Sequence, residues 1–305
     1  MTHIPVLLKE VLEALNPKPG DFIIDGTVGE GGHAKEIVRK IGSGGIFLGV
    51  DWDGSQVERA KKNLESKNVK VVITQGNYRE IPDIQKKRNL PKADGLLLDL
   101  GFSSNHLWSG RGFSFEKDEP LDMRYDADND NDKMTAADVI NSFSEQNLAN
   151  LLWKYGEERA SRKIAKAIVE ARKKEKILTT GQLVKIIEKV VSHSHSHSHS
   201  HRPSIHPATK VFQALRIYVN DELGNLENIL GSIAEIMRPG GRIVIISFHS
   251  LEDRMVKQAF KKLEEEGKAR RINKKVIKPS WEEIQKNPRS RSAKLRVVEI
   301  LNPKS

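Results

Sequence analysis

The 305-residue chain contains no cysteine. This absence excludes disulfide bonds, thiolate metal sites and cysteine nucleophiles, and it suits the reducing cytoplasm, where we expect the protein to reside. The chain also lacks any apolar run close to the roughly 18 residues that a membrane span requires, and its first residues do not have the profile of a signal peptide. We therefore expect a soluble protein that has no membrane partner.

Positive charge is in excess. The chain has 51 Lys and Arg against 41 Asp and Glu, which gives a formal net charge of +10. Segment 254–304 alone holds 16 Lys and Arg against 6 Glu, a surplus of ten. Such a segment is typical of a phosphate-binding surface, although a solvated, solubilising face has the same composition. The length allows one large or two modest domains.

A glycine-rich stretch, 22–33, reads Phe-Ile-Ile-Asp-Gly-Thr-Val-Gly-Glu-Gly-Gly-His. The apolar residues that end at Asp25 predict a buried parallel strand, and the glycines predict a tight turn into a helix. Glycine lacks a Cβ and tolerates positive φ, so the amides of Gly31 and Gly32 can approach a ligand at the helix start near His33.

The spacing indicates which ligand binds there. Asp51 ends a second apolar strand about 20 residues after the glycines, where a carboxylate can hold ribose hydroxyls. A dinucleotide and S-adenosylmethionine both contain such a ribose. A pyrophosphate favours G-x-G-x-x-G, whereas the methionine tail carries an ammonium group that favours a carboxylate such as Asp25. The pattern D-x-x-x-G-x-G therefore favours S-adenosylmethionine over a dinucleotide or an empty turn. Tyr78 follows the third strand, where the adenine end would lie.

Alternating strands and helices predict a doubly wound, mostly parallel α/β sheet. The alternation stops after Gly101, and several helices without strands predict an inserted helical domain. We expect one domain formed by 1–109 and 206–305 and an insert formed by 110–205. The expected strands are 22–25, 46–51, 69–74, 95–100, 242–248 and 295–301, and the expected helices include 136–141, 145–155, 157–174, 180–191 and a single long helix over 208–236.

Two polar segments resemble metal-binding loops only superficially. Segment 126–132 lacks the Gly and the terminal Glu of a calcium loop, so we interpret it as a solvated acidic loop. The Ser-His tract 192–201 can bind Zn²⁺ or Ni²⁺ in solution, but it has no acidic ligand nearby and no supporting shell. We predict a flexible, exposed loop there and no metal cofactor.

The segment after the fourth strand, 96–106, faces the reacting group in an open α/β sheet. It resembles the Asp-Pro-Pro-Tyr site of amino-group methyltransferases. An exocyclic amine of a nucleobase becomes nucleophilic when an acceptor binds its N–H, so Asp99 is the candidate amine acceptor and Phe102 a candidate stacking partner for a flipped base. Asp99 could instead cap the next turn or contact only the cofactor. Catalysis by orientation needs no covalent nucleophile. Methylation at cytosine carbon 5 normally uses a cysteine thiolate, so the absence of cysteine argues against that reaction.

Eight segments, in order and over nearly the whole chain, resemble the MraW/RsmH family of bacterial small-subunit ribosomal RNA cytosine-N4 methyltransferases. These segments are 3–8, 25–33, 96–101, 111–115, 120–124, 155–159, 206–216 and 247–254.

The resemblance implies a class I, Rossmann-like methyltransferase with an inserted helical domain. It implies transfer of a methyl group from S-adenosylmethionine to the exocyclic amine of a decoding-centre cytidine in 16S ribosomal RNA. The small ribosomal subunit would be the partner, in the cytoplasm, and the enzyme would be a monomer or homodimer. The family usually has Phe where this chain has Tyr78, and often Gln where it has His106. By position, the family's cofactor contacts fall on Gly31, Gly32, His33, Asp51, Tyr78, Asp99 and His106.

The resemblance also implies roles in RNA binding. The helical insert would recognise RNA, and Arg289 and Arg291 in the basic tail would bind phosphates. His249, just after the fifth strand, is a candidate contact to the target nucleotide, and a buried structural histidine is the alternative. Two other functions stay open from the residues alone, namely a methyltransferase of this fold that acts on DNA or a small amine, and an RNA-associated nucleotide-binding protein without catalysis.

Overall fold

The computed structural model describes residues 4–66, 68–101, 104–126, 133–192 and 206–302. The chain divides into two compact units. The first, which we call the sheet unit, consists of Met1–Phe102 and Leu223–Ser305, and the second, the helical unit, consists of Ser103–Glu222. Within the described residues, no helix combines the length and the apolar character that crossing a membrane requires.

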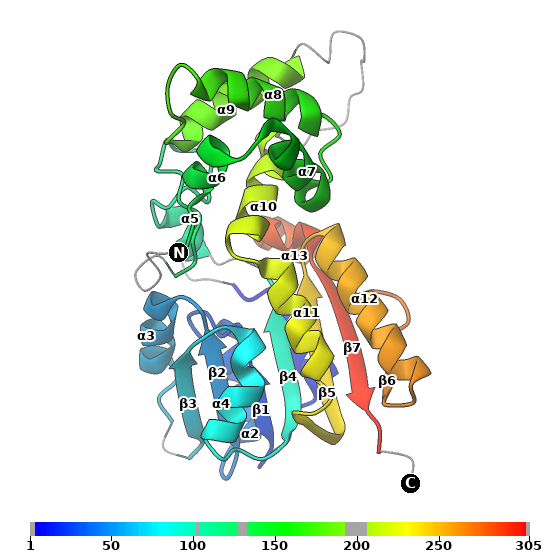
Figure 1. The fold of residues 1–305 in the computed structure, drawn as a ribbon. Coiled ribbons are helices and arrows are strands. Elements are labelled where there is room, and N and C mark those ends of the chain that lie inside the picture. The colour runs from blue at the N-terminus through cyan, green and yellow to red at the C-terminus, as the bar shows by residue number, and fades with distance from the viewer. Residues whose placement is uncertain (1–3, 67, 102–103, 127–132, 193–205, 303–305) are drawn as a thin grey trace. The chain divides into compact units, whose positions relative to one another are not determined.

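The sheet unit is built on one seven-stranded sheet with the order β3-β2-β1-β4-β5-β7-β6 (Figure 1). The first five strands in this order are parallel, and β7 is antiparallel to both of its neighbours. This confirms the predicted doubly wound, mostly parallel sheet. The strands are β1 (Phe22–Asp25), β2 (Ile46–Asp51), β3 (Lys70–Gln75), β4 (Ala93–Asp99), β5 (Met237–Ser247), β6 (Ala269–Arg271) and β7 (Lys294–Ile300).

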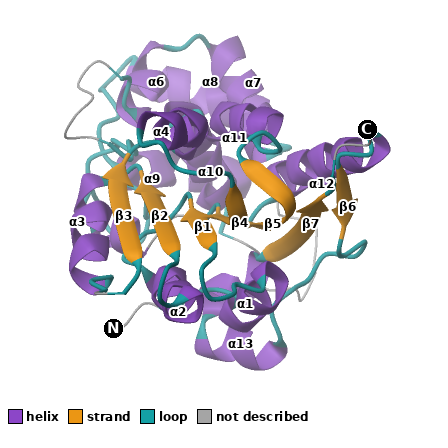
Figure 2. Ribbon diagram, turned by 90° about the horizontal axis from the view of Figure 1, so that it is seen from below, coloured by secondary structure: helices purple, strands orange, loops and turns teal. Residues whose placement is uncertain are grey.

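Helices cover both faces of this sheet (Figure 2). One face packs against α1 (Leu8–Leu15), α2 (Gly32–Ile41) and α3 (Gly54–Asn63), and the other against α4 (Ile81–Lys87), α11 (Glu222–Ser232) and α12 (Ser250–Glu265). The central strands are therefore buried on both sides, which explains their unbroken apolar runs.

The short helix α13 (Trp281–Lys286) adjoins the chain segment before α1, because the carboxylate of Glu283 accepts a hydrogen bond from the Leu7 amide at 2.7 Å. Two 3₁₀ helices, η1 (Tyr78–Glu80) and η2 (Pro288–Ser292), complete this unit.

The helical unit has its own apolar core, formed by residues between Phe113 and Val219. Its N-caps follow from the sequence: Thr135 forms a capping box with Asp138, and the Ser144 hydroxyl accepts the Asn147 amide. The helices are α5 (Ser104–Trp108), α6 (Ala136–Ser142), α7 (Glu145–Gly156), α8 (Ser161–Arg172), α9 (Thr180–Ser192) and α10 (Ala208–Val219).

The expected single helix over 208–236 was wrong, because two helices, α10 and α11, occupy this segment. The helical conformation is interrupted at Asp221, whose φ of 47° lies in the left-handed region. The preceding side chain, Asn220, accepts the Tyr125 amide at 2.9 Å and donates to the Met123 carbonyl at 2.7 Å. These hydrogen bonds connect the interruption to a loop that lies 95 to 97 residues earlier in the sequence, and so they fix its position.

The boundaries of the two units differ from the domains expected from the sequence. The expected insert, 110–205, lies inside the helical unit, which is wider at both ends. Helix α10 belongs to the part of the sequence that predicts the sheet domain, but it packs in the helical core through Val211 and Leu215. Most of the Ser-His tract 192–201 and of the acidic segment 126–132 lies outside the described residues.

A glycine in α7 offers a test of the packing between α7 and α10. An alanine Cβ at Gly156 would lie 2.5 Å from the Lys210 carbonyl oxygen. We expect Gly156→Ala to lower the free energy of unfolding by about 1–3 kcal/mol, although alanine favours helix. Gly231→Ala is the control, since a Cβ there meets nothing within 4 Å, and it should be neutral or stabilising. Urea unfolding measures both, and equal effects would contradict this packing.

Candidate active site

Three carboxylates stand at the carboxyl ends of three adjacent strands. Asp25 is the last residue of β1, Asp51 of β2 and Asp99 of β4 (Figure 1). The strand order reverses between β1 and β4, and in open α/β sheets ligands bind at such a switch point. The structure therefore brings together the three acids that the sequence analysis singled out.

The glycine-rich loop between β1 and α2 is held by backbone hydrogen bonds to both neighbouring strands. The Gly26 amide donates to the Leu97 carbonyl and the Val28 amide to the Val50 carbonyl, each at 3.0 Å. Gly31 has φ of 91° and immediately precedes α2, and a Cβ there would lie 3.0 Å from the Leu64 side chain. Glycine is thus required at Gly31 by conformation as well as by space.

The carboxylate of Asp51 is fixed by two backbone amides. One oxygen accepts the Gly29 amide at 2.8 Å and the other accepts the Asp53 amide at 3.0 Å. This arrangement fits the predicted contact to a ribose, because the carboxylate is oriented before any ligand arrives.

Asp25 is almost completely buried, with 1% of its surface exposed. Burial raises the pKa of Asp25 to about 7, and the neighbouring carboxylates of Asp99 and Asp51 push it in the same direction. The nearby His33 side chain and the Thr27 amide oppose this rise. A cationic ligand group would favour the ionised form of Asp25, which is the form that suits the ammonium of a methionine tail.

His33 lies between the glycine loop and Asp99. Its Nε2 is 3.6 Å from a carboxylate oxygen of Asp99, and neither ring nitrogen has a hydrogen-bond partner among the described residues. The ring is buried, with 7% of the residue exposed. Asp99 itself is positioned through its amide, which donates to the Thr27 hydroxyl at 2.7 Å. Polar groups buried without partners are suited to a bound ligand.

The loop after β3 adds a residue that the sequence analysis missed. Asn77 caps η1 by accepting the Arg79 amide at 3.0 Å through Oδ1, so its Nδ2 must point elsewhere. That Nδ2 is buried and has no partner within the described residues. The neighbouring Tyr78 lies beside the glycine loop, since a Cβ on Gly26 would be 3.1 Å from the Tyr78 Cβ. The signal in the sequence was an Asn two residues after the end of a strand, a position from which it can cap the next turn.

The remaining predicted residues lie elsewhere or cannot be located. Phe102 is outside the described residues. His106 belongs to the helical unit, where its ring packs 4.8 Å from Tyr125 and 5.3 Å from Phe113. Arg289 and Arg291 are exposed in η2. None of these observations tests the roles predicted for them.

His249 has a structural position at the start of α12. Its Nδ1 accepts the Glu252 amide at 3.3 Å, and the Glu252 carboxylate accepts the Phe248 amide at 2.8 Å. The pair forms a capping box. The cap satisfies Nδ1, whereas Nε2 is buried, has no hydrogen-bond partner among the described residues and lies 3.1 Å from a carboxylate oxygen of Glu252. A contact to the target nucleotide stays a prediction.

The residues at the switch point fit a cationic ligand better than a diphosphate. Three carboxylates that interact with one another would repel a pyrophosphate, whereas a sulfonium and an ammonium group would relieve their repulsion. The buried donor of Asn77 and the oriented acceptor of Asp51 suit a base and a ribose. The site thus has a complementary group for each part of S-adenosylmethionine.

Comparison with known protein families decides the class of enzyme. The model of the MraW methylase family matches residues 1–301. The chain belongs to this family. Its membership confirms the predicted methyltransferase class and S-adenosylmethionine as the cofactor.

Two similar proteins have a name that agrees with the family match. A protein of Dictyoglomus thermophilum named "Ribosomal RNA small subunit methyltransferase H" is 48% identical over 299 residues, 97% of this chain and 96% of its own. A Clostridioides difficile protein of the same name is 42% identical over 97% of this chain and 98% of its own. Among solved structures, a putative rRNA methylase from Clostridium thermocellum aligns with a TM-score of 0.46 at 12% identity, over 98% of this chain and all of the other.

The buried Asp25 predicts an unusual dependence of stability on pH. Because its pKa is higher in the folded protein than the ordinary value of 3.8, the native state binds more protons than the unfolded state between these values. Stability is therefore lost as the pH rises to about 7 and is not regained above it. We expect Asp25→Asn, which still accepts the Thr27 amide, to stabilise the ligand-free protein at pH 8 by up to about 4 kcal/mol.

At pH 4.5 the two proteins should differ by only about 1 kcal/mol, because this pH is less than one unit above the unfolded pKa of 3.8 and most of the loss of stability occurs between pH 4.5 and about 7. Urea unfolding at both pH values measures the difference. A variant that is less stable than the wild type at pH 8, or a stability gain that is the same at both pH values, would contradict this account.

Proposed function

We propose that the protein transfers a methyl group from S-adenosylmethionine to the exocyclic N4 of a cytidine in the decoding centre of 16S ribosomal RNA. The family match and the names of the relatives support methylation of small-subunit ribosomal RNA. The observation that carries the proposal at the site is the convergence of Asp25, Asp51 and Asp99 beside His33. The partner is the small ribosomal subunit, the compartment is the cytoplasm, and the enzyme acts as a monomer or homodimer.

The chemistry requires an acceptor for the amine. The lone pair of a cytosine amine is delocalised into the ring, so an acceptor that binds its N–H makes the nitrogen more nucleophilic. Asp99 ends β4 with its backbone fixed by Thr27, and its carboxylate is partly exposed, at 18% of the side chain. We assign to Asp99 the role of binding and orienting the amine and of accepting the proton that N4 loses as its bond to the methyl carbon forms and the bond from that carbon to the sulfonium sulfur breaks.

The cofactor, when bound, supplies an electrophilic methyl group on a sulfonium. Asp51 holds the ribose, Asp25 in its ionised form binds the ammonium, and Asn77 donates to an acceptor of the adenine ring. His33 is buried beside Asp99, with its Nε2 3.6 Å from the carboxylate, and its ring nitrogens would contact the bound ligand. Alignment of two bound reactants can lower the barrier by roughly 7–11 kcal/mol, so no covalent intermediate is needed.

Asp99→Ala tests the assigned acceptor. We expect turnover at saturating cofactor to fall by about 10²-fold or more, because the amine loses its acceptor. Affinity for S-adenosylmethionine, measured by calorimetry, should change far less. If Asp99 contacts only the cofactor, the affinity falls and the turnover at saturation is kept, and this result would refute the assigned role.

The readout is transfer of labelled methyl groups to small subunits from a strain that lacks the enzyme, followed by nucleoside analysis. We expect the label on N4-methylcytidine. Label that appears only on ribose or on cytosine carbon 5 excludes the proposal. Activity on short DNA without activity on ribosomal particles favours a DNA or small-amine methyltransferase, and cofactor binding without any transfer favours a binding protein.

Asn77→Asp tests the contact to adenine. The variant keeps the Oδ1 that caps η1 but replaces the buried donor by an acceptor, so we expect about tenfold or greater loss of affinity for S-adenosylmethionine. Calorimetry with 5′-methylthioadenosine, which retains the adenine and lacks the amino-acid tail, should show a similar loss. Unchanged affinity for both compounds, with the fold intact by circular dichroism, would contradict the contact.

A further inference from the structure

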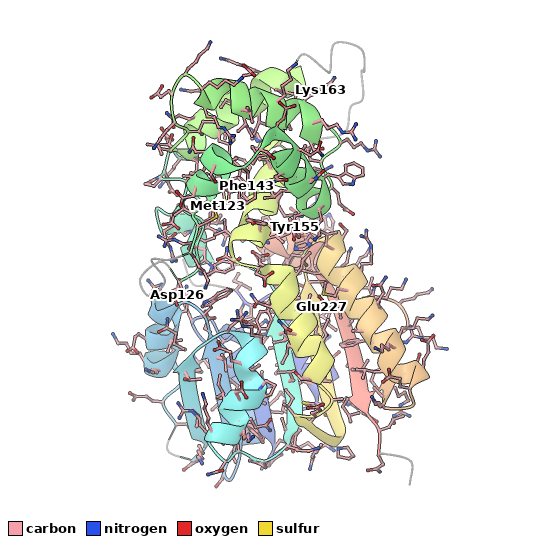
Figure 3. The ribbon with its side chains drawn as sticks, viewed as in Figure 1. Met123, Asp126, Phe143, Tyr155, Lys163 and Glu227 are labelled. Carbon is pink, nitrogen blue, oxygen red and sulfur yellow. The ribbon has the colours of Figure 1, made fainter. Side chains whose placement is uncertain are left out.

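Helix α8 of the helical unit has one apolar face and one basic face. Ile164, Ala165 and Ile168 are completely buried in the helical core. The opposite side exposes Arg162, Lys163 and Lys166, and Lys163 is labelled in Figure 3. Arg159 is exposed in the turn that precedes the helix. We call these four cations the α8 basic face.

The spacing of these residues places their charges on one surface. Positions 159, 162, 163 and 166 follow the i, i+3, i+4, i+7 pattern that aligns side chains along a helix, although Arg159 itself precedes the first turn. At 1.5 Å per residue, this stripe extends over about 10 Å. A row of cations of this length matches a nucleic-acid backbone better than a single anionic group.

The four cations are not used to stabilise the fold. Among the described residues, none of them forms an ion pair or a hydrogen bond. Two other basic residues at the end of α8 are used in this way: Arg172 donates to the Ile140 and Phe143 carbonyls, and Lys173 pairs with Glu170 at 2.7 Å. Lys173, and to a smaller degree Lys166, lowers the pKa of the Glu170 carboxyl, so the charge of Lys166 is partly balanced. Like charges held close together repel one another, so an anionic partner would stabilise this face.

An exposed aromatic side chain lies at the same end of the α7–α8 hairpin. Trp153 is in the last turn of α7 and has 60% of its surface exposed, and the turn that leads from it into α8 carries Arg159. The next residue, Lys154, lies over the Tyr155 ring at 4.9 Å, which adds a further cation to this end. An exposed indole and exposed cations in one helical hairpin are typical of single-stranded nucleic-acid binding, where bases stack on aromatic rings.

We propose that the α8 basic face binds phosphates of the RNA substrate and that Trp153 stacks on one of its unpaired bases. The proposal rests on the proposed function, which supplies an RNA substrate, and it names the surface of the helical unit that binds it. Four cations provide affinity that falls with salt, and one indole provides a contact that does not depend on salt. RNA is favoured over an acidic protein because the surface combines cations with an exposed aromatic ring.

The test compares two triple variants that change the net charge equally. Arg162→Gln/Lys163→Gln/Lys166→Gln removes three cations of the α8 basic face. Lys173→Gln/Lys174→Gln/Lys176→Gln removes three exposed cations at the other end of the same helix and beyond it. The probe is unmethylated 16S ribosomal RNA in small subunits from a strain that lacks the enzyme, and filter binding is measured from 50 to 200 mM salt.

We expect the first variant to lose tenfold or more in affinity at low salt, and the slope of log K against log salt to become shallower by about 2–3. Its KM for the subunit should rise, with the turnover number nearly unchanged. The second variant should lose much less. Trp153→Ala should weaken binding about tenfold without a change of slope, and Trp153→Phe should restore most of this loss.

Equal losses in both triple variants would overturn the proposal, because only net charge would then matter. Wild-type affinity in the first variant would also overturn it, as would tighter binding of poly-glutamate than of RNA by this face. Calorimetry with S-adenosylmethionine distinguishes failure of the proposed function from failure of the role proposed for the α8 basic face. If the wild type binds the cofactor but neither binds nor methylates small subunits, the proposed function fails as well, whereas methylation with an unchanged KM in the first variant refutes only the α8 basic face.

Discussion

The repulsion between carboxylates at the switch point of the sheet is the constraint on which the rest of the site depends. Asp25 is held in a buried position by the end of β1, next to the strands that end in Asp51 and Asp99. Burial of an acid near other acids is unfavourable in the absence of a cation. Asp25 stays buried because the loop that follows it is hydrogen-bonded to the Leu97 and Val50 carbonyls, which keeps Asp25 out of solvent. A cationic ligand then binds to a site that is already formed.

Much of this arrangement could be predicted from the sequence. The three strands were evident as short apolar runs that end in an acid, and their alternation with helices predicted parallel neighbours. In a parallel sheet the carboxyl ends meet at one edge, so Asp25, Asp51 and Asp99 had to converge. The need for glycine at Gly31 followed from the turn. These features are local, or follow from topology alone, and sequence patterns report them well.

Features that depend on distant partners could not be predicted. The apolar spacing over 208–236 continues through Asp221, because Val219 faces the helical core while Leu226 faces the sheet core. The apolar periodicity of the sequence shows that Val219 and Leu226 are both buried. It does not show that they lie in two different cores. The bonds from Asn220 to the loop at Met123 decide where the helix breaks. The cap formed by His249 and the free donor of Asn77 likewise depend on side-chain geometry, and a residue pattern alone leaves several roles open for both.

Cofactor binding and RNA binding need opposite charges, so we expect different residues of the chain to perform them. A cluster of three carboxylates suits a sulfonium cofactor and a neutral base, but it repels the phosphates on either side of that base. RNA must therefore be held by cations away from this cluster. In segment 254–304, several cations form ion pairs within the fold: Arg296 and Lys294 pair with Asp253, and Arg271 pairs with Glu264. Fewer remain for phosphates than the net charge suggests, and a second basic surface such as that of α8 would supply the difference.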